Sequence, residues 1–256
     1  MAQYWFLVGV CSGTVLGVSG AGGAMVSVPL FVWIFNYSVK DVMTCSLLCA
    51  VLGATINWVA QRRNTNFKAV LSVVSTSWIG SRIGVQLKAS IPEWALVLVF
   101  LAVCTLMMRS LWGKKKEIKP LLNLNGVKGW SLCLSSGVGI GALTALTGLG
   151  GGVVLVPLFF GLLGLEFSQA VSSSLLSTVF FASSSFLFQW KNAMTLLDRW
   201  DFLSLLGGTF IAAASVKVGI SKVKKHHFDQ LRRWTLSAVI CVALFSLTMR
   251  TFFPKS

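Results

Sequence analysis

Two glycine clusters are the features of this sequence best suited to bind a small molecule. Gly20-Ala-Gly22-Gly23 follows Ser19, and Gly148-Leu-Gly150-Gly151-Gly152 follows Thr147. A helix that begins at such a cluster presents unpaired N–H groups and a partial positive charge, and glycine lets an anion approach the backbone closely. The hydroxyls of Ser19 and Thr147 add hydrogen-bond donors or helix caps. These residues predict an anion cradle made of two facing helix ends.

The two clusters occupy equivalent positions of an internal repeat. A shift of 128 residues aligns them, and it also aligns Val28-Pro29-Leu30-Phe31 with Val156-Pro157-Leu158-Phe159. Over residues 9–64 the shift gives 18 identities in 56 ungapped positions, which indicates a duplicated chain. We expect a first membrane repeat at residues 1–113, a basic cytoplasmic linker at 114–128 and a second membrane repeat at 129–256.

The composition places both repeats in a membrane. Of the 256 residues, 55% are hydrophobic and only 11% are charged, whereas a soluble domain carries about 25% charged residues. This balance excludes a soluble enzyme. Apolar stretches that approach the roughly 20 residues of a membrane-spanning helix alternate with short basic intervals. The sequence predicts an all-α, multi-pass integral membrane protein, and its net charge of +15 is assigned to loops beside anionic lipid rather than to nucleic acid.

Each repeat is expected to contain five helical segments, and the first two form a short pair broken by the glycine cluster. The segments are residues 3–18, 22–36, 39–62, 67–88 and 92–112, then 129–146, 150–165, 167–191, 200–221 and 232–251. Clustered glycines interrupt a helix, and Pro29 and Pro157 should kink the segments that contain them. Irregular backbone at membrane depth is tolerated only where protein buries it or a watery cavity hydrates it.

Two topologies fit this pattern. If each broken pair makes one crossing, the repeats are parallel; if each pair is a re-entrant hairpin, the repeats are inverted. Inversion puts 15 of the 22 basic residues on one side and 7 on the other, against 13 and 9 for the parallel arrangement. The positive-inside rule therefore favours inversion. The predicted fold is two inverted repeats, each a short glycine-broken helix pair plus three transmembrane helices.

Small and hydroxyl-bearing residues of the repeat have two interpretations. Those spaced four apart favour close helix packing; they are Gly9, Gly13 and Gly17 in the first repeat and Gly137, Gly141 and Ala145 in the second. Ser46 and Ser174 follow the broken pairs at equivalent positions. They are expected either to bond their own helix backbone or to line the substrate site.

Arg82 and Lys217 are cations flanked by apolar residues, and a shift of 135 residues aligns them. Such a cation is a candidate for an anion pathway, although both lie near segment ends, where a long side chain can reach the lipid headgroups. The acidic residues fall at segment ends or in loops, and the cysteines lie in apolar runs without metal-ligand partners. We therefore expect no enzyme activity, no metal and no cofactor.

The duplicated glycine and Val-Pro pattern resembles the sulfite exporter TauE/SafE family of membrane permeases. The resemblance covers nearly the whole chain, with one slight departure, Ala24 in the position of Gly152. It implies a bacterial-type inner-membrane carrier for sulfite, sulfonates or related organosulfur anions.

We therefore expect a secondary transporter, or permease, for small anions that works by alternating access around two glycine-rich helix breaks. Its partners are the anionic substrate and membrane lipid, and the sequence predicts no particular oligomeric state. The predicted substrate-binding residues are Ser19, Gly20, Gly22, Gly23, Ser46, Thr147, Gly148, Gly150, Gly151, Gly152 and Ser174, with Arg82 and Lys217 as candidate pathway residues. The alternatives are an anion channel on the same fold and a membrane scaffold without transport activity.

Overall fold

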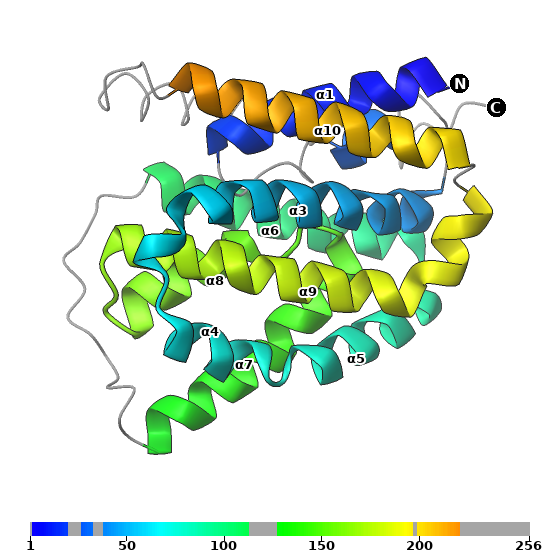
Figure 1. Cartoon of the computed structure of the whole chain (residues 1–256). Helices are drawn as coiled ribbons and strands as arrows, with labels where there is room; N and C mark the ends of the chain where they lie inside the picture. The colour runs from blue at the N-terminus through cyan, green and yellow to red at the C-terminus, as the bar shows by residue number, and fades with distance from the viewer. Residues whose placement is uncertain (1, 20–26, 33–37, 113–126, 197–198, 221–256) are drawn as a thin grey trace.

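The protein is a bundle of helices (Figure 1). The computed structural model describes residues 2–19, 27–32, 38–112, 127–196 and 199–220, and the regular structure in these ranges is entirely helical. The elements are α1 (Ala2–Ser19), α3 (Val39–Gln61), η1 (Arg62–Asn64), α4 (Phe67–Val74), α5 (Ser77–Ser90), α6 (Glu93–Trp112), α7 (Val127–Thr147), α8 (Gly152–Pro157), η2 (Leu158–Leu162), α9 (Phe167–Leu196) and α10 (Arg199–Ile220). Residues 27–32 form a further helical stretch.

The predicted all-α membrane fold is confirmed. Three helices in the described ranges are long and apolar enough to cross a membrane: Val39–Asn64, Trp130–Thr147 and Ser168–Lys191. Large apolar side chains such as Trp78, Ile83 and Phe210 are exposed, while many serines and threonines are buried. An apolar exterior around a polar interior suits a lipid environment, where polar groups must find their partners inside the protein.

The predicted segment 67–88 differs from the structure, because it divides into α4 and α5 at a turn. Hydroxyl groups compete with the helical backbone there. Ser75 Oγ donates to Ser72 O (3.3 Å), and Thr76 Oγ1 donates to Leu134 O of α7 (2.7 Å). Such side-chain bonds offer the backbone an alternative to a continuous helix. The segment predicted as 167–191 is one helix that extends further, to Leu196.

Helices α3 and α9, the equivalent third segments of the two repeats, lie against one another in antiparallel directions. Near the start of α3, Thr44 Oγ1 donates to Gln189 Oε1 of α9 (2.8 Å). At the other end of α3, Ser172 Oγ of α9 donates to Gln61 O (2.9 Å). The 128-residue shift relates Thr44 to Ser172 and Gln61 to Gln189. Inverted repeats require this antiparallel arrangement, and the inversion itself stays a prediction.

The first helix of each repeat packs against the fourth segment of the other repeat. Figure 1 shows α1 beside α10, and a Cβ on Gly13 would lie 2.6 Å from Thr209 O. Helix α7 contacts α5 in the same manner, with a Cβ on Gly141 only 2.8 Å from Ser77 O. The packing interpretation of the spaced glycines is therefore confirmed at Gly9, Gly13, Gly137 and Gly141.

Two apolar clusters fill the space between these helices. One surrounds α3 and includes Met43, Leu47 and Phe100. The other surrounds α7 and α8 and includes Leu155 and Phe159. The connection between α7 and α8 passes from one cluster to the other, because Leu149 belongs to the first and Leu155 to the second. The glycine cluster of the second repeat is thus held at the centre of the packed bundle.

The α5–α7 contact predicts that Gly84→Ala destabilises the protein. A Cβ on Gly84 would lie 2.5 Å from Ala142 O and 2.8 Å from Ala145 Cβ. Overpacking of this kind costs about 1–3 kcal/mol, so the Tm in detergent, followed by tryptophan fluorescence, should fall by several degrees. Gly139→Ala on α7 is the control, because no atom lies within 4 Å of a Cβ there. Equal Tm values for the two variants would contradict this packing.

Candidate functional site

The connection from α7 to α8 is a turn with a left-handed backbone. Gly148, Gly150 and Gly151 have φ angles of 71°, 77° and 74°, a conformation that glycine adopts without a steric penalty. Gly148 N donates to Thr144 O (2.9 Å) and closes α7, and Leu155 N donates to Gly151 O (3.1 Å) and opens α8. Three of the glycines predicted as an anion cradle, Gly148, Gly150 and Gly151, are therefore required by the backbone of this turn.

Helices from both repeats enclose the glycine turn, defined as residues 148–152. A Cβ on Gly150 would lie 2.9 Å from Ala50 Cβ of α3 and 3.0 Å from Thr178 Cγ2 of α9. Ser46 Oγ of α3 donates to Gly148 O (3.1 Å). All five residues of the turn are buried. The turn contacts α3 and α9 where these two helices lie against one another.

Thr144 has a hydroxyl without a hydrogen-bond partner among the described residues, and it lies beside the glycine turn. It is 1% exposed, and its Oγ1 is a buried polar atom without a hydrogen-bond partner in the described part of the chain. Because most buried polar atoms are hydrogen-bonded, such an atom requires an explanation. A Cβ on Gly151 would lie 2.7 Å from this oxygen. The first amides of α8, those of Gly152 and Val153, have no partner within the helix. A hydroxyl and backbone donors thus lie close together.

Thr147 caps the turn locally. Its Oγ1 donates to Leu143 O (2.7 Å) and accepts from Leu149 N (3.4 Å). The expectation that Thr147 caps the following helix is wrong, because the N-cap of α8 is Gly151 and has no side-chain cap bond. Thr144 was not among the predicted residues, although its position four residues before Gly148, on the last turn of α7, is the signal that would have identified it.

The helix that follows the turn is short and irregular, as the sequence predicts. Helix α8 ends at Pro157, and residues Leu158–Leu162 continue it as a π-helix. Proline removes an intrahelical hydrogen bond, and a π-helical turn is a recognised way to accommodate the resulting irregularity. Leu165 N then donates to Phe159 O (3.2 Å).

The structure brings together six of the predicted substrate-binding residues, namely Ser46, Thr147, Gly148, Gly150, Gly151 and Gly152. Both equivalent serines bond their own helix, Ser46 Oγ to Met43 O (2.9 Å) and Ser174 Oγ to Val171 O (2.8 Å), but among the described residues only Ser46 also bonds the glycine turn. Ser19 ends α1, and Gly20, Gly22 and Gly23 lie outside the described residues. The pairing of the two glycine clusters therefore stays a prediction.

Of the two predicted pathway cations, the structure describes the side chain of Arg82 only. Arg82 is exposed on α5, with its guanidinium 5.8 Å from the centre of the Phe188 ring. Lys217 belongs to α10, and its side chain lies outside the described part of the structure. Their pathway role stays a prediction.

Lys88 is a buried cation that the sequence analysis did not select as a site residue. It is only 4% exposed, and its Nζ donates to Thr44 Oγ1 (2.9 Å) and Gln189 Oε1 (2.7 Å). Its signal in the sequence is helical spacing, because Ser81, Gly84 and Lys88 form one buried face of α5. Its position two residues before the end of the helix concealed this signal.

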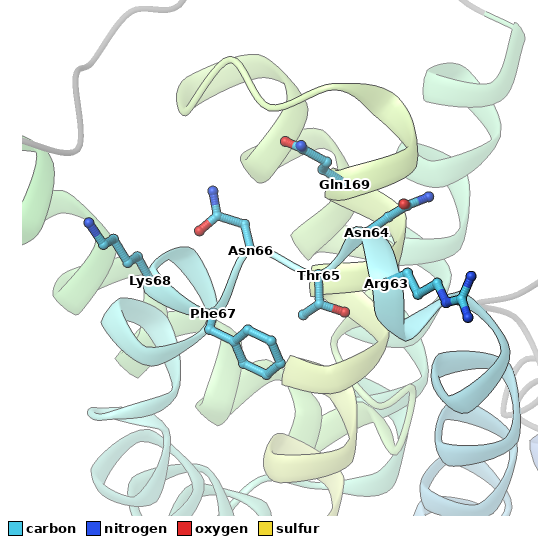
Figure 2. A pocket seen from close by; sticks show the side chains of 7 residues that line it. All are labelled: Arg63, Asn64, Thr65, Asn66, Phe67, Lys68 and Gln169. Carbon is cyan, nitrogen blue, oxygen red and sulfur yellow. The ribbon is translucent and has the colours of Figure 1, made fainter.

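A separate pocket of about 360 Å³ opens on the surface at the junction of η1 and α4 (Figure 2). Its lining residues are Arg63, Asn64, Thr65, Asn66, Phe67, Lys68 and Gln169. Arg63 and Lys68 are exposed and point away from one another. The junction is anchored to α9, where Asn64 Nδ2 donates to Ser168 Oγ (2.7 Å). None of the predicted substrate-binding residues lines this pocket.

A bundle of apolar helices that buries polar groups around a broken helix defines a multi-pass integral membrane protein. The chain matches the sulfite exporter TauE/SafE family over residues 5–246 and belongs to that family. It is 28% identical over 264 residues to a probable membrane transporter protein of Haemophilus influenzae. The alignment covers 93% of this chain and 95% of that protein. No solved structure matches the chain. The protein is therefore a member of a membrane transporter family.

The contacts of the glycine turn predict different results for two equivalent serines. Ser46→Ala removes the hydroxyl that bonds both Met43 O of its own helix and Gly148 O of the turn, and a buried acceptor without its donor costs about 1–3 kcal/mol. Ser174→Ala removes only a bond within its own helix. The Tm in detergent should therefore fall by several degrees in the first variant and by less than about one degree in the second. A larger loss for Ser174→Ala would contradict the contacts described here.

Proposed function

We propose that this membrane transporter is a secondary carrier for small anions of the sulfite, sulfonate or related organosulfur class. Family membership supports transport across a membrane. The observation that carries the anionic substrate class is the glycine turn, residues 148–152, with the unpartnered hydroxyl of Thr144 beside it. We further propose that its counterpart, Gly20–Gly23, completes the site from the first repeat.

The chemistry of the glycine turn suits an anion that has lost its water. Backbone amides and hydroxyls are donors that bind oxyanions through charge-assisted hydrogen bonds, and glycine leaves the approach to the amides unobstructed. Sulfite and sulfonates each present three oxygen atoms that can accept such bonds at once. Ser46 and Thr147 hold the turn in place through Gly148 O and Leu149 N. In this proposal Ser46 and Thr147 position the amides of the turn, and the hydroxyl of Thr144 donates a hydrogen bond to the substrate.

The position of the turn suits alternating access. It contacts α3 of the first repeat at Ala50 and α9 of the second repeat at Thr178. A movement of one repeat against the other would therefore change what surrounds the turn, while the turn itself stays intact. The interrupted helix formed by α8 and η2 adds a place where the backbone can adjust.

An anion channel on the same fold is the alternative that transport kinetics distinguish. In proteoliposomes, unlabelled sulfite or methanesulfonate on the inside should accelerate uptake of the labelled anion if the protein is a carrier. Equal uptake with and without internal anion would favour a channel. No saturable movement of any anion of this class would overturn the proposed substrate class.

The glycine turn predicts that Gly150→Ala impairs anion transport. A side chain at this φ of 77° is strained, and the added Cβ would contact Ala50 and Thr178. The strain, about 1–2 kcal/mol, and these contacts should displace the amides of the turn from their anion-binding positions, so we expect uptake and anion affinity to fall at least tenfold. The measurements are counterflow in proteoliposomes and calorimetric titration with sulfite in detergent.

Gly164→Ala is the matched control for this variant. Gly164 also has a positive φ, of 63°, but it is exposed and lies beyond η2. It therefore imposes a comparable backbone strain away from the glycine turn. Wild-type transport by Gly150→Ala, or an equal loss in both variants, would contradict the role assigned to the turn.

A further inference from the structure

Lys88 differs from the other cations whose side chains the structure describes. It is 4% exposed, whereas Arg62, Arg63, Lys68, Arg82, Arg109 and Lys191 are exposed and Lys40 is partly exposed. The long side chain does not carry its ammonium out to the surface, although Lys88 lies only two residues before the end of α5. A lysine in this position can usually reach the interface, so its burial requires a reason.

Neutral oxygens hold the ammonium of Lys88. Thr44 Oγ1 of α3 and Gln189 Oε1 of α9 accept from it at 2.9 and 2.7 Å. An ammonium has three N–H donors, and the described residues supply acceptors for two of them. Asp41, the acidic residue nearest in α3, accepts instead from Ser38 Oγ at 2.7 Å. In the described part of the chain, Lys88 is thus a buried positive charge without a carboxylate hydrogen-bonded to it.

The packing of α3 against α9 does not require this charge. The opposite end of the same helix pair is closed by Ser172, which donates to Gln61 O at 2.9 Å and bonds Thr65 Oγ1 at 2.7 Å. Ser172 is the repeat equivalent of Thr44, and at its end of the helix pair neutral hydroxyls are sufficient to join the two helices. Asp41 acts on this ammonium only through space, and burial of an ion without a directly bonded counter-charge costs several kcal/mol. The charge therefore needs a function beyond holding the two helices together.

Lys88 and the glycine turn contact the same turn of α3. Thr44 accepts a hydrogen bond from the ammonium of Lys88, while Met43 and Ser46 contact Gly148. A seam of buried polar groups continues from Gln189, whose Nε2 donates to Ser185 O at 3.1 Å. Ser185 Oγ in turn donates to Ser81 Oγ at 3.0 Å. The ammonium is thus one end of a hydrogen-bonded network inside the protein.

We propose that the ammonium of Lys88 binds the transported anion, and that Thr44 and Gln189 position it. The inference rests on the proposed function and adds a specific residue to it. The matching ligand is a small oxyanion such as sulfite or a sulfonate, because one oxygen accepts from the third N–H while the negative charge offsets the buried ammonium. Neutral analogues of the same shape are excluded, because they leave that charge uncompensated.

Gln189→Glu tests this proposal without removing the lysine. The substitution preserves shape and places a carboxylate where the amide oxygen accepts from Lys88 at 2.7 Å. The internal carboxylate then supplies a directly bonded counter-charge, so the affinity for sulfite and methanesulfonate should fall at least tenfold. The variant gains this ion pair but loses the bond from Nε2 to Ser185 O, so its Tm should stay within several degrees of wild type. Calorimetric titration in detergent measures the affinity, and counterflow measures transport. Gln169→Glu in the surface pocket is the control, with affinity expected within about twofold of wild type.

Variants of Lys88 itself test the charge separately. Lys88→Gln should abolish anion binding, and Lys88→Arg, which keeps the charge, should retain binding within about tenfold. If Lys88→Gln does not fold, Gln189→Glu decides the question. Wild-type affinity in Gln189→Glu or in a folded Lys88→Gln would overturn the role of Lys88 alone. Absence of anion binding and transport in the wild-type protein would overturn the proposed function and, with it, this inference.

Discussion

The antiparallel contact between α3 and α9 is the constraint on which the rest of the structure depends. Inside an apolar bundle every polar side chain must find a partner within the protein, and these two helices supply partners to each other at both ends. Their alignment fixes the positions of the elements packed against them. The glycine turn contacts both helices, at Ala50 and Thr178, and Lys88 of α5 bonds Thr44 and Gln189. Both candidate anion-binding features therefore depend on one contact.

Exchange of helices between the repeats supports that contact from outside. Helix α1 packs on α10 and α7 packs on α5, in each case through glycines that bring two backbones together. Neither repeat can therefore form its full set of contacts alone. Close packing through small residues is the usual way that helices associate in lipid, where apolar burial between helices gives little driving force. The result is a closely packed outer frame around a centre that contains buried hydroxyls, an amide and an ammonium.

Much of this arrangement could be predicted from the sequence, because helix periodicity and the repeat are local signals. The packing glycines, the irregular helix at Pro157 and most of the described segment boundaries agree with the structure, except that 67–88 divides into two helices and 167–191 extends to Leu196. Properties that depend on distant contacts could not be predicted in the same way. The burial of Lys88 results from Gln189, which lies about a hundred residues away in the chain. The break between α4 and α5 involves the bond from Thr76 to Leu134 on α7, and the unpartnered state of Thr144 depends on how the glycine turn packs.

The most direct test of the central claim, that α3 and α9 cross the membrane in opposite directions, is side-specific cysteine labelling. Single cysteines would replace Arg63 and Ser168 at one end of the helix pair, and Ala89 and Lys191 at the other end; all four positions are exposed. We expect an impermeant maleimide to label residues 63 and 168 from one side of the membrane and residues 89 and 191 only from the opposite side. Labelling of residues 63 and 168 from different sides, or of all four from the same side, would contradict the antiparallel crossing.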